Sequence, residues 1–441
     1  MDVFFSTGEK SGDRIAAAVA VALRREFPDL DLAGLTGPDA MRAGIRGAFD
    51  GTDFAMTGVD WRNVRAWSRL LPAVLEMIRR RPPKLFVAVA HPTFNLPLAG
   101  LLPAGVRKII IGPPEIWGWE TTRLAGAIAS AIGWVPRLLG RTFSTLHAPY
   151  IAARRGPLAL RNFDDLLCLT PMNLAAYTAL RERLGAAARI AQVVHPAAAL
   201  RRTEELDRRA ADLRANLRLA DGEHLLGIFP GSREGELRVV LPRMLQAARE
   251  ILRRRDDVRA AVSVSDRRFE PLVATLLERH GGGLCQAGRL QTTSAPANEL
   301  LAASCHAMLC SGTLTLEAAC LGAAGTVCYR LTPTGAVLLR TFCHHRYIAG
   351  RPAPLGLPNA LAAFAGVGPR ELPYAECVKS RCRANLITRC VQDALPAGPH
   401  TKDCRPRLDE RMESLIRQSI QPAGACPPAE HVLRIYRDLS A

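Results

Sequence analysis

Short apolar segments alternate with amphipathic, helix-like segments along most of the chain, and this alternation limits the fold more than any other feature. The apolar segments fall into two series. The first occupies residues 3–5, 30–35, 85–89, 108–111, 166–169 and 190–194, and the second occupies residues 225–229, 260–264, 307–310 and 326–329. Buried strands that alternate with helices are typical of parallel sheets covered by helices on both faces. The sequence therefore predicts an α/β protein.

A polar, charged and helix-like stretch at residues 197–222 separates the two series. A chain of 441 residues is too long for one hydrophobic core. We therefore predict two Rossmann-like, doubly wound domains at residues 1–199 and 200–394, with ligand sites at the carboxyl ends of their strands. Residues 395–441 are expected to form a linker and a last helix that packs back on the first domain.

The charge balance indicates an anionic partner. The chain has 58 basic and 41 acidic residues, a net charge of +17, which suits an anionic membrane, a sugar phosphate or nucleic acid. Because nearly all the basic residues are scattered arginines, drift in composition explains the excess equally well. No zinc-finger or RNA-binding signature is present, so nucleic acid is not expected. The twelve cysteines form no CxxC pair, and neither a metal nor another cofactor is expected.

Two segments bear on the membrane. The longest uncharged stretch, residues 85–106, is interrupted by Pro92, Pro97 and Pro103 and is not expected to span a bilayer. No export signal precedes the first strand, which predicts a cytoplasmic protein. Residues 61–82 form an amphipathic segment that combines tryptophans with arginines. Such a helix suits a membrane interface, although an ordinary domain helix with a solvated face would have the same pattern.

The first strand leads into Gly8-Glu9-Lys10-Ser11-Gly12-Asp13 and then a helix. Glycines at such a turn let the backbone approach a ligand, and the helix N-terminus supplies amide donors. Ser11 and Gly12 are therefore candidate binding residues, although a structural turn with Asp13 as the helix N-cap explains the loop equally well. Glu9 is a candidate catalytic residue because a carboxylate at the mouth of a cleft is costly without a function.

Two loops of the second half favour a nucleoside diphosphate. Gly231, Ser232 and Arg233 follow a strand and precede a helix, where their amides and the guanidinium can bind phosphate oxygens. An ordinary capped turn is the alternative. Ser311, Gly312 and Thr313 repeat the arrangement after a later strand, and Glu317 follows one helical turn on, suited to the hydroxyls of a ribose.

Taken together, the loops resemble those of the lipid-A-disaccharide synthase family. The matching pieces, in the family's order, are Gly8 to Asp13, Pro92-x-Phe94-Asn95, Trp117-Gly118-Trp119, His195, Pro230 to Arg233, Ser311 to Glu317, Tyr329-Arg330 and Leu357-Pro358-Asn359. The resemblance implies a GT-B fold and a hexosyltransferase. It would transfer 2,3-diacylglucosamine from UDP to lipid X, 2,3-diacylglucosamine 1-phosphate, to form a β-1,6 disaccharide without a metal.

The resemblance also implies where the protein acts and which residues hold its ligands. It places the protein peripherally on the cytoplasmic face of the inner membrane and leaves a homodimer open. Tyr329 and Asn359 would join the loops of the second domain around UDP, and Arg233 and helix dipoles would stabilise the leaving group.

The acceptor side departs from the family. The family's general-base aspartate is replaced by Ala90, its Pro-Phe-Glu by Pro171-Met172-Asn173, and a further aspartate by Ala199. His91 could replace the missing base because its pKa lies near the working range, and Glu9 is another candidate. Two alternatives stay open: a catalytically silent UDP-sugar-binding homologue at the membrane, and a GT-B enzyme or epimerase with different acceptor chemistry.

Overall fold

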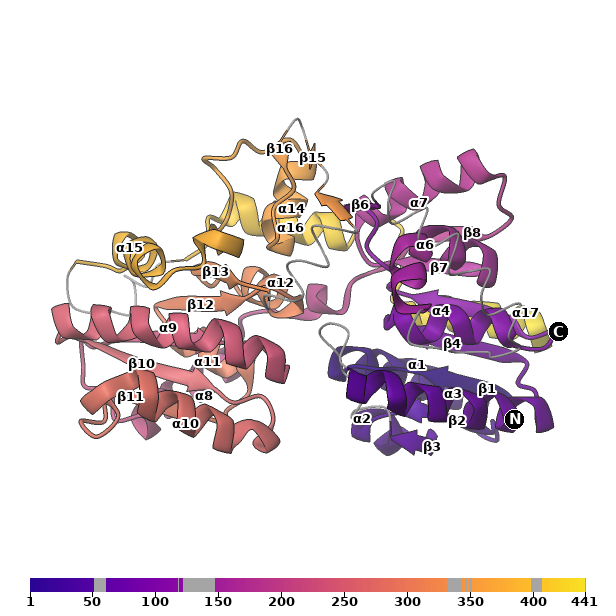
Figure 1. Ribbon diagram of the computed structural model, residues 1–441, viewed down its shortest axis with the longest axis horizontal. Coiled ribbons are helices and arrows are strands. Elements are labelled where there is room, and N and C mark those ends of the chain that lie inside the picture. Colours follow the sequence, from indigo (N-terminus) through magenta and orange to yellow (C-terminus); the bar gives the residue numbers. More distant parts are fainter. Residues whose placement is uncertain are drawn as a thin grey trace. The chain divides into compact units, whose positions relative to one another are not determined.

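The chain divides into two compact units, each built around one parallel sheet. The computed structural model describes residues 1–50, 61–117, 119–121, 147–331, 343–345, 347–348, 351–397 and 407–440. The first unit comprises Met1–Pro196, Gly335–Tyr347 and Ser419–Ala441, and the second comprises Ala197–Thr334 and Ile348–Gln418. Both chain termini therefore belong to the first unit (Figure 1).

The first unit contains a seven-stranded parallel sheet with the order β3-β2-β1-β4-β5-β7-β8. Its strands are β1 (Val3–Ser6), β2 (Leu32–Thr36), β3 (Arg46–Asp50), β4 (Leu85–Val89), β5 (Arg107–Ile111), β7 (Asp165–Cys168) and β8 (Arg189–Gln192). Its helices are α1 (Lys10–Glu26), α2 (Pro38–Arg42), α3 (Trp61–Arg80), α4 (Pro92–Leu101), α6 (His147–Asn162), α7 (Pro171–Leu184) and α17 (Pro428–Ser440).

Alternation along the strands sends side chains to two separate cores. In β1, Val3 and Phe5 pack with α1 and α17, whereas Phe4 packs with α3, α4, α6 and α7. The last helix, α17, packs on α1, where the Tyr436 and Phe27 rings meet edge-on at 5.3 Å. Helices therefore cover both faces of the sheet (Figure 1).

The second unit contains a six-stranded parallel sheet with the order β11-β10-β9-β12-β13-β17. Its strands are β9 (His224–Phe229), β10 (Val258–Ser263), β11 (Leu290–Thr293), β12 (His306–Cys310), β13 (Gly325–Tyr329) and β17 (Ala375–Val378). Its helices are α8 (Glu204–Asn216), α9 (Glu234–Arg254), α10 (Glu270–Gly281), α11 (Ala297–Ala303), α12 (Thr313–Cys320), α14 (Leu357–Phe364), α15 (Ala384–Ala394) and α16 (Glu410–Ile420). Two small sheets lie outside the parallel ones: β6 (Trp119–Thr121) pairs with β14 (Cys343–His345), both of the first unit, and β15 (Tyr347–Ile348) pairs with β16 (Arg351–Pro352).

The second sheet is also covered on both faces. Leu226 and Ile228 of β9 join the core beneath α9, α10 and α15. On the opposite face Gly227 lies so close to Ser304, just after α11, that a Cβ would approach the Ser304 Oγ to 2.5 Å. The strand order matches the Rossmann pattern 3-2-1-4-5-6. The predicted α/β fold with two Rossmann-like domains is confirmed.

The amphipathic helix expected at residues 61–82 forms, but part of its apolar face is core. Leu71, Val74, Leu75 and Ile78 of α3 are buried against the sheet, as in an ordinary domain helix, so these four side chains do not face lipid. Arg79 to Arg81 are exposed. The side chains of residues 61–69, including both tryptophans, lie outside the described residues. In the described part of the chain, no helix has the length and apolar character needed to cross a bilayer.

Candidate functional site

In the first unit the loops that follow β1 and β4 meet at the point where the strand order of the sheet reverses. β1 and β4 are neighbours, but α1 and α4, which follow them, pack on opposite faces. Such a switch point leaves an opening at the carboxyl ends of the strands. Asn95 links the two ends: its Oδ1 accepts the Ser6 hydroxyl at 2.6 Å, and its Nδ2 donates to the Ala90 carbonyl at 2.9 Å. Asn95 is fully buried and has a structural role.

The residues after β4 adopt an unusual backbone. Ala90 and His91 both have left-handed conformations, with φ of 49° and 48°. This region costs a residue with a side chain about 1–2 kcal/mol, and such strain gathers at functional sites. In an extended strand, neighbouring side chains point to opposite faces of the sheet. Because Ala90 and His91 are not extended, this rule does not determine the direction of the His91 side chain.

The His91 imidazole lies against the Gly8 backbone. A Cβ added to Gly8 would lie 2.4 Å from the His91 Cγ, so only glycine fits beside the ring. The His91 ring also stacks on the Phe94 ring, with centroids 6.1 Å apart. His91 is only 7% exposed, whereas the neighbouring Glu9 is partly exposed. The structure thus brings both candidate bases to the same strand ends.

The Gly8 to Asp13 loop is built differently from the expected capped turn. Glu9, not Asp13, is the N-cap residue of α1, and the helix begins at Lys10. The buried Asp13 carboxylate instead accepts the amides of Gly37 and Asp39 at 2.7 and 2.8 Å, which caps α2. Gly12 is buried against Val89, and Ser11 is exposed. Of this loop, Glu9, Lys10 and Ser11 are therefore the side chains that solvent can reach.

A third loop of the first unit follows β5 and leads to Trp117. Asn173 donates to the Pro113 carbonyl at 3.2 Å and accepts the Ile116 amide at 3.4 Å, and the Tyr177 hydroxyl donates to Pro114 at 3.0 Å. An amide can donate to a carbonyl, which a carboxylate cannot, so Asn173 suits this position. The Trp117 indole N–H finds no acceptor among the described residues. Gly118 and the Trp119 side chain lie outside the described residues.

In the second unit the switch point falls between β9 and β12. The loop after β9 places Gly231 at φ 105°, which favours glycine, and Arg233 at the N-cap of α9. Glu236, one turn into the helix, accepts the Arg233 guanidinium at 3.0 Å and the Ser232 amide at 3.2 Å. Its carboxylate is buried. Glu236 therefore holds the loop with the same donors that were expected to meet a phosphate.

The loop after β12 contains Ser311, Gly312 and Thr313. Gly312 and Thr313 are exposed at the start of α12, and nothing lies within 4 Å of a Cβ added to Gly312, so a ligand can approach the backbone there. The Ser311 hydroxyl donates to the Leu355 carbonyl at 2.8 Å, so its proton is already used inside the unit. Glu317 is half-buried in α12.

Asn359 is a supporting residue for this loop. It is fully buried, its Nδ2 donates to Glu376 at 3.0 Å and to Tyr374 at 2.8 Å, and its Oδ1 accepts the Tyr374 amide at 2.9 Å. Glu376 in turn accepts the amides of Leu355 and Gly356 at 3.1 and 2.8 Å. Asn359 thus orients Glu376, and Glu376 fixes the segment that receives Ser311.

Tyr329 ends β13 and lies within the electrostatic reach of the Arg233 loop. Burial, and then the charge of Glu236, raise the pKa of Tyr329 to about 12, while Arg233 opposes the shift.

Glu236 and Glu376 were not predicted from the sequence. The position of Glu236, three residues after an N-cap, is the place where a helix-capping glutamate is found, and this signal could have indicated it. A cluster of three side chains able to hold a metal is absent from the residues that the structure describes.

Comparison with known proteins identifies relatives over most of the chain. The sequence model of the lipid-A-disaccharide synthetase family (LpxB) matches residues 3–139 and 191–366. A lipid-A-disaccharide synthase from Verminephrobacter eiseniae is 30% identical over 416 residues, which covers 92% of this chain and 90% of the relative.

Solved structures share the fold at low identity. The UDP complex of MnaA from S. aureus has a TM-score of 0.56 and 10% identity, with 100% of this chain and 98% of that chain covered. WaaG, a glycosyltransferase involved in lipopolysaccharide biosynthesis, has a TM-score of 0.52 and 14% identity, with 98% and 99% covered.

Proposed function

This chain belongs to the lipid-A-disaccharide synthase family and is a GT-B glycosyltransferase of lipid A biosynthesis. We therefore propose that it transfers 2,3-diacylglucosamine from UDP to lipid X. The observation that carries the proposal is the pair of loops at the switch point of the second sheet, with Arg233 at one and the open backbone of Gly312 at the other. In the transfer, the acceptor hydroxyl oxygen attacks the anomeric carbon with inversion, the bond to UDP breaks, and the hydroxyl proton passes to a base.

The nucleotide would bind to the second unit. The amides of Gly231 and Thr313 and the Arg233 guanidinium offer donors to the diphosphate, at the N-termini of α9 and α12. Glu317 would accept the ribose hydroxyls. Arginine has five N–H donors, so the bond from Arg233 to Glu236 leaves others for phosphate. These groups would stabilise the charge that develops on departing UDP.

Tyr329, Ser311 and Asn359 would contribute to this site in different ways. Tyr329 is half-buried beside the Arg233 loop, where its ring could contact the nucleotide. Ser311 would present its hydroxyl oxygen and not its proton, because the proton is bonded to Leu355. Asn359 would act indirectly, by holding Glu376.

The proton would be accepted in the first unit by Glu9 or by His91. Burial favours Glu9 as the group that reaches the acceptor, since it keeps solvent access and His91 is enclosed by Gly8 and Phe94. The exposed Ser11 would bind the acceptor from the same loop, and Gly12 would let α1 pack closely on Val89. A positioned base contributes roughly 10²–10⁴-fold to a rate.

Membrane association would be peripheral. The acyl chains of the proposed substrates require access to lipid, and exposed Arg79 to Arg81 lie at the end of α3. Arginines near an anionic surface each contribute about 1 kcal/mol to binding. The proposed location is the cytoplasmic face of the inner membrane.

One observation favours a second candidate function. The position of the family's general base is occupied by Ala90, which has no group to accept a proton. A UDP-sugar-binding protein without turnover would result if neither Glu9 nor His91 serves. The two functions are separated by incubating the purified chain with UDP-diacylglucosamine and lipid X: the transferase makes disaccharide and releases UDP, and the binding protein only binds the donor.

A further inference from the structure

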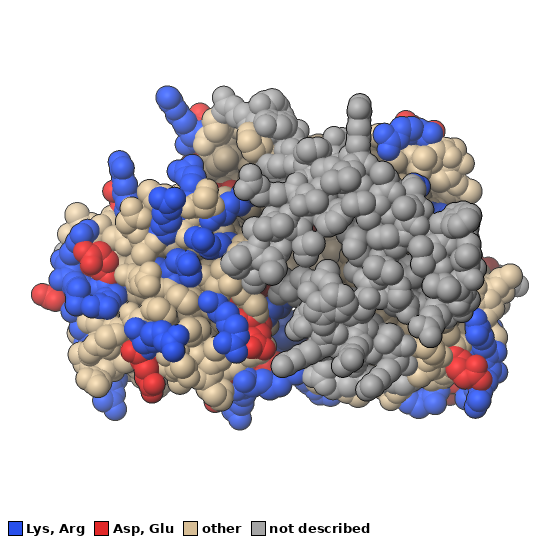
Figure 2. Space-filling model, viewed as in Figure 1, with Lys and Arg blue, Asp and Glu red and all other residues tan. Residues whose placement is uncertain are grey.

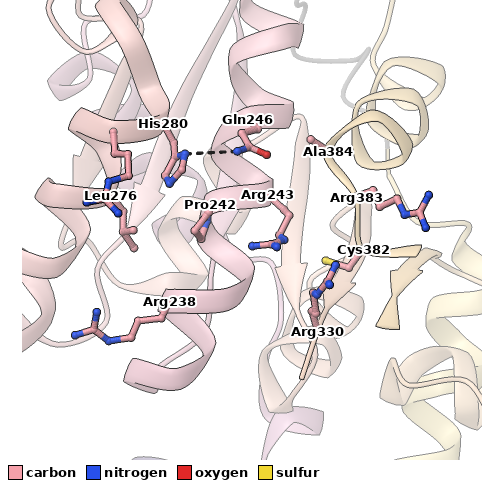
Figure 3. A pocket seen from close by; sticks show the side chains of 11 residues that line it. Arg238, Pro242, Arg243, Gln246, Leu276, His280, Arg330, Cys382, Arg383 and Ala384 are labelled. Carbon is pink, nitrogen blue, oxygen red and sulfur yellow. Dashed lines mark hydrogen bonds between the residues drawn. The ribbon is translucent and has the colours of Figure 1, made fainter. Parts of the chain in front are cut away.

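The second unit contains a cavity of about 490 Å³, and five of the eleven residues that line it are arginines. It lies along α9, between α10 on one side and the end of β13 and the start of α15 on the other (Figure 3). Five arginines and one histidine line it: Arg238, Arg243, Arg279, Arg330, Arg383 and His280. We call it the arginine cavity. None of the loop residues Gly231 to Arg233 or Ser311 to Glu317 lines it.

The positive charge of the arginine cavity is largely unbalanced. Among the described residues that line it there is no aspartate or glutamate. Arg238 forms an ion pair with Glu234 at 2.7 Å, but among the residues that the structure describes no carboxylate pairs with Arg243, Arg279, Arg330 or Arg383. Like charges held together repel each other, and a bound anion would relieve this repulsion.

The positive charge of the arginine cavity also affects His280, which lines it. Burial and the charges of Arg279 and Arg243 lower the pKa of His280 below its usual range. The His280 Nδ1 lies 3.5 Å from the Gln246 amide nitrogen. An imidazole in a cationic cavity favours its neutral form, and a bound anion would reverse that preference.

The cavity has the size and the donors for a phosphate group. One water molecule needs roughly 10–15 Å³ of such space, so a cavity of about 490 Å³ holds a phosphate or diphosphate with part of its hydration. Arg243 and Arg330 are both partly buried and extend into the same space between α9 and α15 (Figure 3). One Arg243 nitrogen donates to the Val239 carbonyl at 3.1 Å, which fixes the side chain while leaving other donors available. Guanidinium groups bind phosphate oxygens in pairs.

Basic side chains also cover the surface of this unit. Figure 2 shows many Lys and Arg side chains on the part of the surface that belongs to the second unit. Such a surface raises the local concentration of anions. We propose that the arginine cavity is a second anion site, which binds a phosphate-bearing group independently of the nucleotide loops.

The test titrates pyrophosphate into the full chain by calorimetry. Arg243→Gln and Arg330→Gln should each weaken binding about tenfold, the usual effect of losing a charge-assisted hydrogen bond. Arg253→Gln is the matched control, because Arg253 is an exposed arginine of the same helix that does not line the cavity. Arg233→Ala should leave this binding event in place, which separates it from the nucleotide loops. NMR of the His280 imidazole, identified with His280→Gln, should show its pKa rising with pyrophosphate.

A second arm identifies the source of the phosphate. Flotation uses vesicles of equal parts phosphatidylglycerol and phosphatidylcholine, with phosphatidylcholine alone as the blank. If Arg243→Gln and Arg330→Gln lower both flotation and pyrophosphate affinity, the site binds lipid headgroups. If they lower only pyrophosphate affinity, the site binds a soluble phosphate compound. The proposal is overturned if pyrophosphate does not bind, or if its binding is insensitive to both cavity substitutions and lost only in Arg233→Ala.

Discussion

Replacing Arg233 with alanine should weaken the binding of UDP while leaving the nucleotide loop itself in place. The guanidinium is at the N-cap of α9 and its side chain is 24% exposed. A hydrogen bond between charged groups contributes about 1.5–3 kcal/mol. At 1.4 kcal/mol per factor of ten, this corresponds to a loss of affinity of roughly 10- to 150-fold.

Arg233→Ala should also lower the stability of the fold, and this effect has to be measured separately from the loss of UDP affinity. Arg233→Ala leaves the buried Glu236 carboxylate with the Ser232 amide but without the guanidinium. Removing one partner of a buried charged pair is destabilising, and we expect a loss of about 1–3 kcal/mol in the free energy of unfolding. Urea unfolding measures this loss, and UDP binding is then measured by calorimetry under conditions where the variant stays folded.

Arg253→Ala is the control, with the same change at the exposed far end of α9. It should leave the UDP affinity unchanged. If Arg233→Ala binds UDP as tightly as the unmodified chain, the diphosphate does not contact this loop and the nucleotide site has been misplaced.

Four further predictions follow from the site, the core and the helix α3. Glu317→Ala should weaken the binding of UDP roughly 10- to 150-fold in the same titration; unchanged affinity would mean that Glu317 does not bind the ribose. Glu9→Gln should lower turnover about 10²–10⁴-fold at unaltered UDP affinity, and if His91→Ala does this instead, His91 is the base. Burial lowers the pKa of His306 from 6.5 to about 4, so the unfolded chain binds its proton first. Stability should therefore fall as the pH drops from 6.5 toward 4, and His306→Gln should show a smaller fall in urea unfolding. Glutamates in place of the arginines at positions 62, 65 and 69 should weaken binding to anionic vesicles by about 1 kcal/mol or more per charge; flotation that ignores them would place the contact elsewhere.

The central strands could be predicted from the sequence because burial on both faces makes them continuous apolar segments. All ten expected strands form within two residues of their predicted starts. The edge strands β3, β11 and β17 were missed, since segments such as Leu290–Thr293 carry polar residues that a one-sided edge tolerates.

The site loops could be found because they follow strands at the switch points, but their internal bonding could not. Asp13 looked like the cap of its own helix, and it caps α2 from 24 residues away in sequence. The direction of His91 depends on two left-handed residues, and no local pattern identifies them. Asn359 matched a binding motif, yet its amide is used inside the unit.

The arginine cavity was invisible in the sequence for a related reason. Its arginines come from α9, α10, the end of β13 and the start of α15, and they lie between positions 238 and 383. Along the sequence these arginines are scattered among other residues, and only the order of the strands in the sheet brings their elements together.

Product formation by the purified chain tests the proposed transfer most directly. The chain is incubated with UDP-diacylglucosamine and lipid X, and disaccharide and UDP are measured by mass spectrometry. We predict that one UDP is released for each disaccharide formed and that the rate falls in Arg233→Ala. The rate should rise in Ala90→Asp, since aspartate tolerates the left-handed backbone of that position. If the chain and Ala90→Asp both bind UDP and neither makes disaccharide, the transferase assignment is wrong and the protein binds the donor without turning it over.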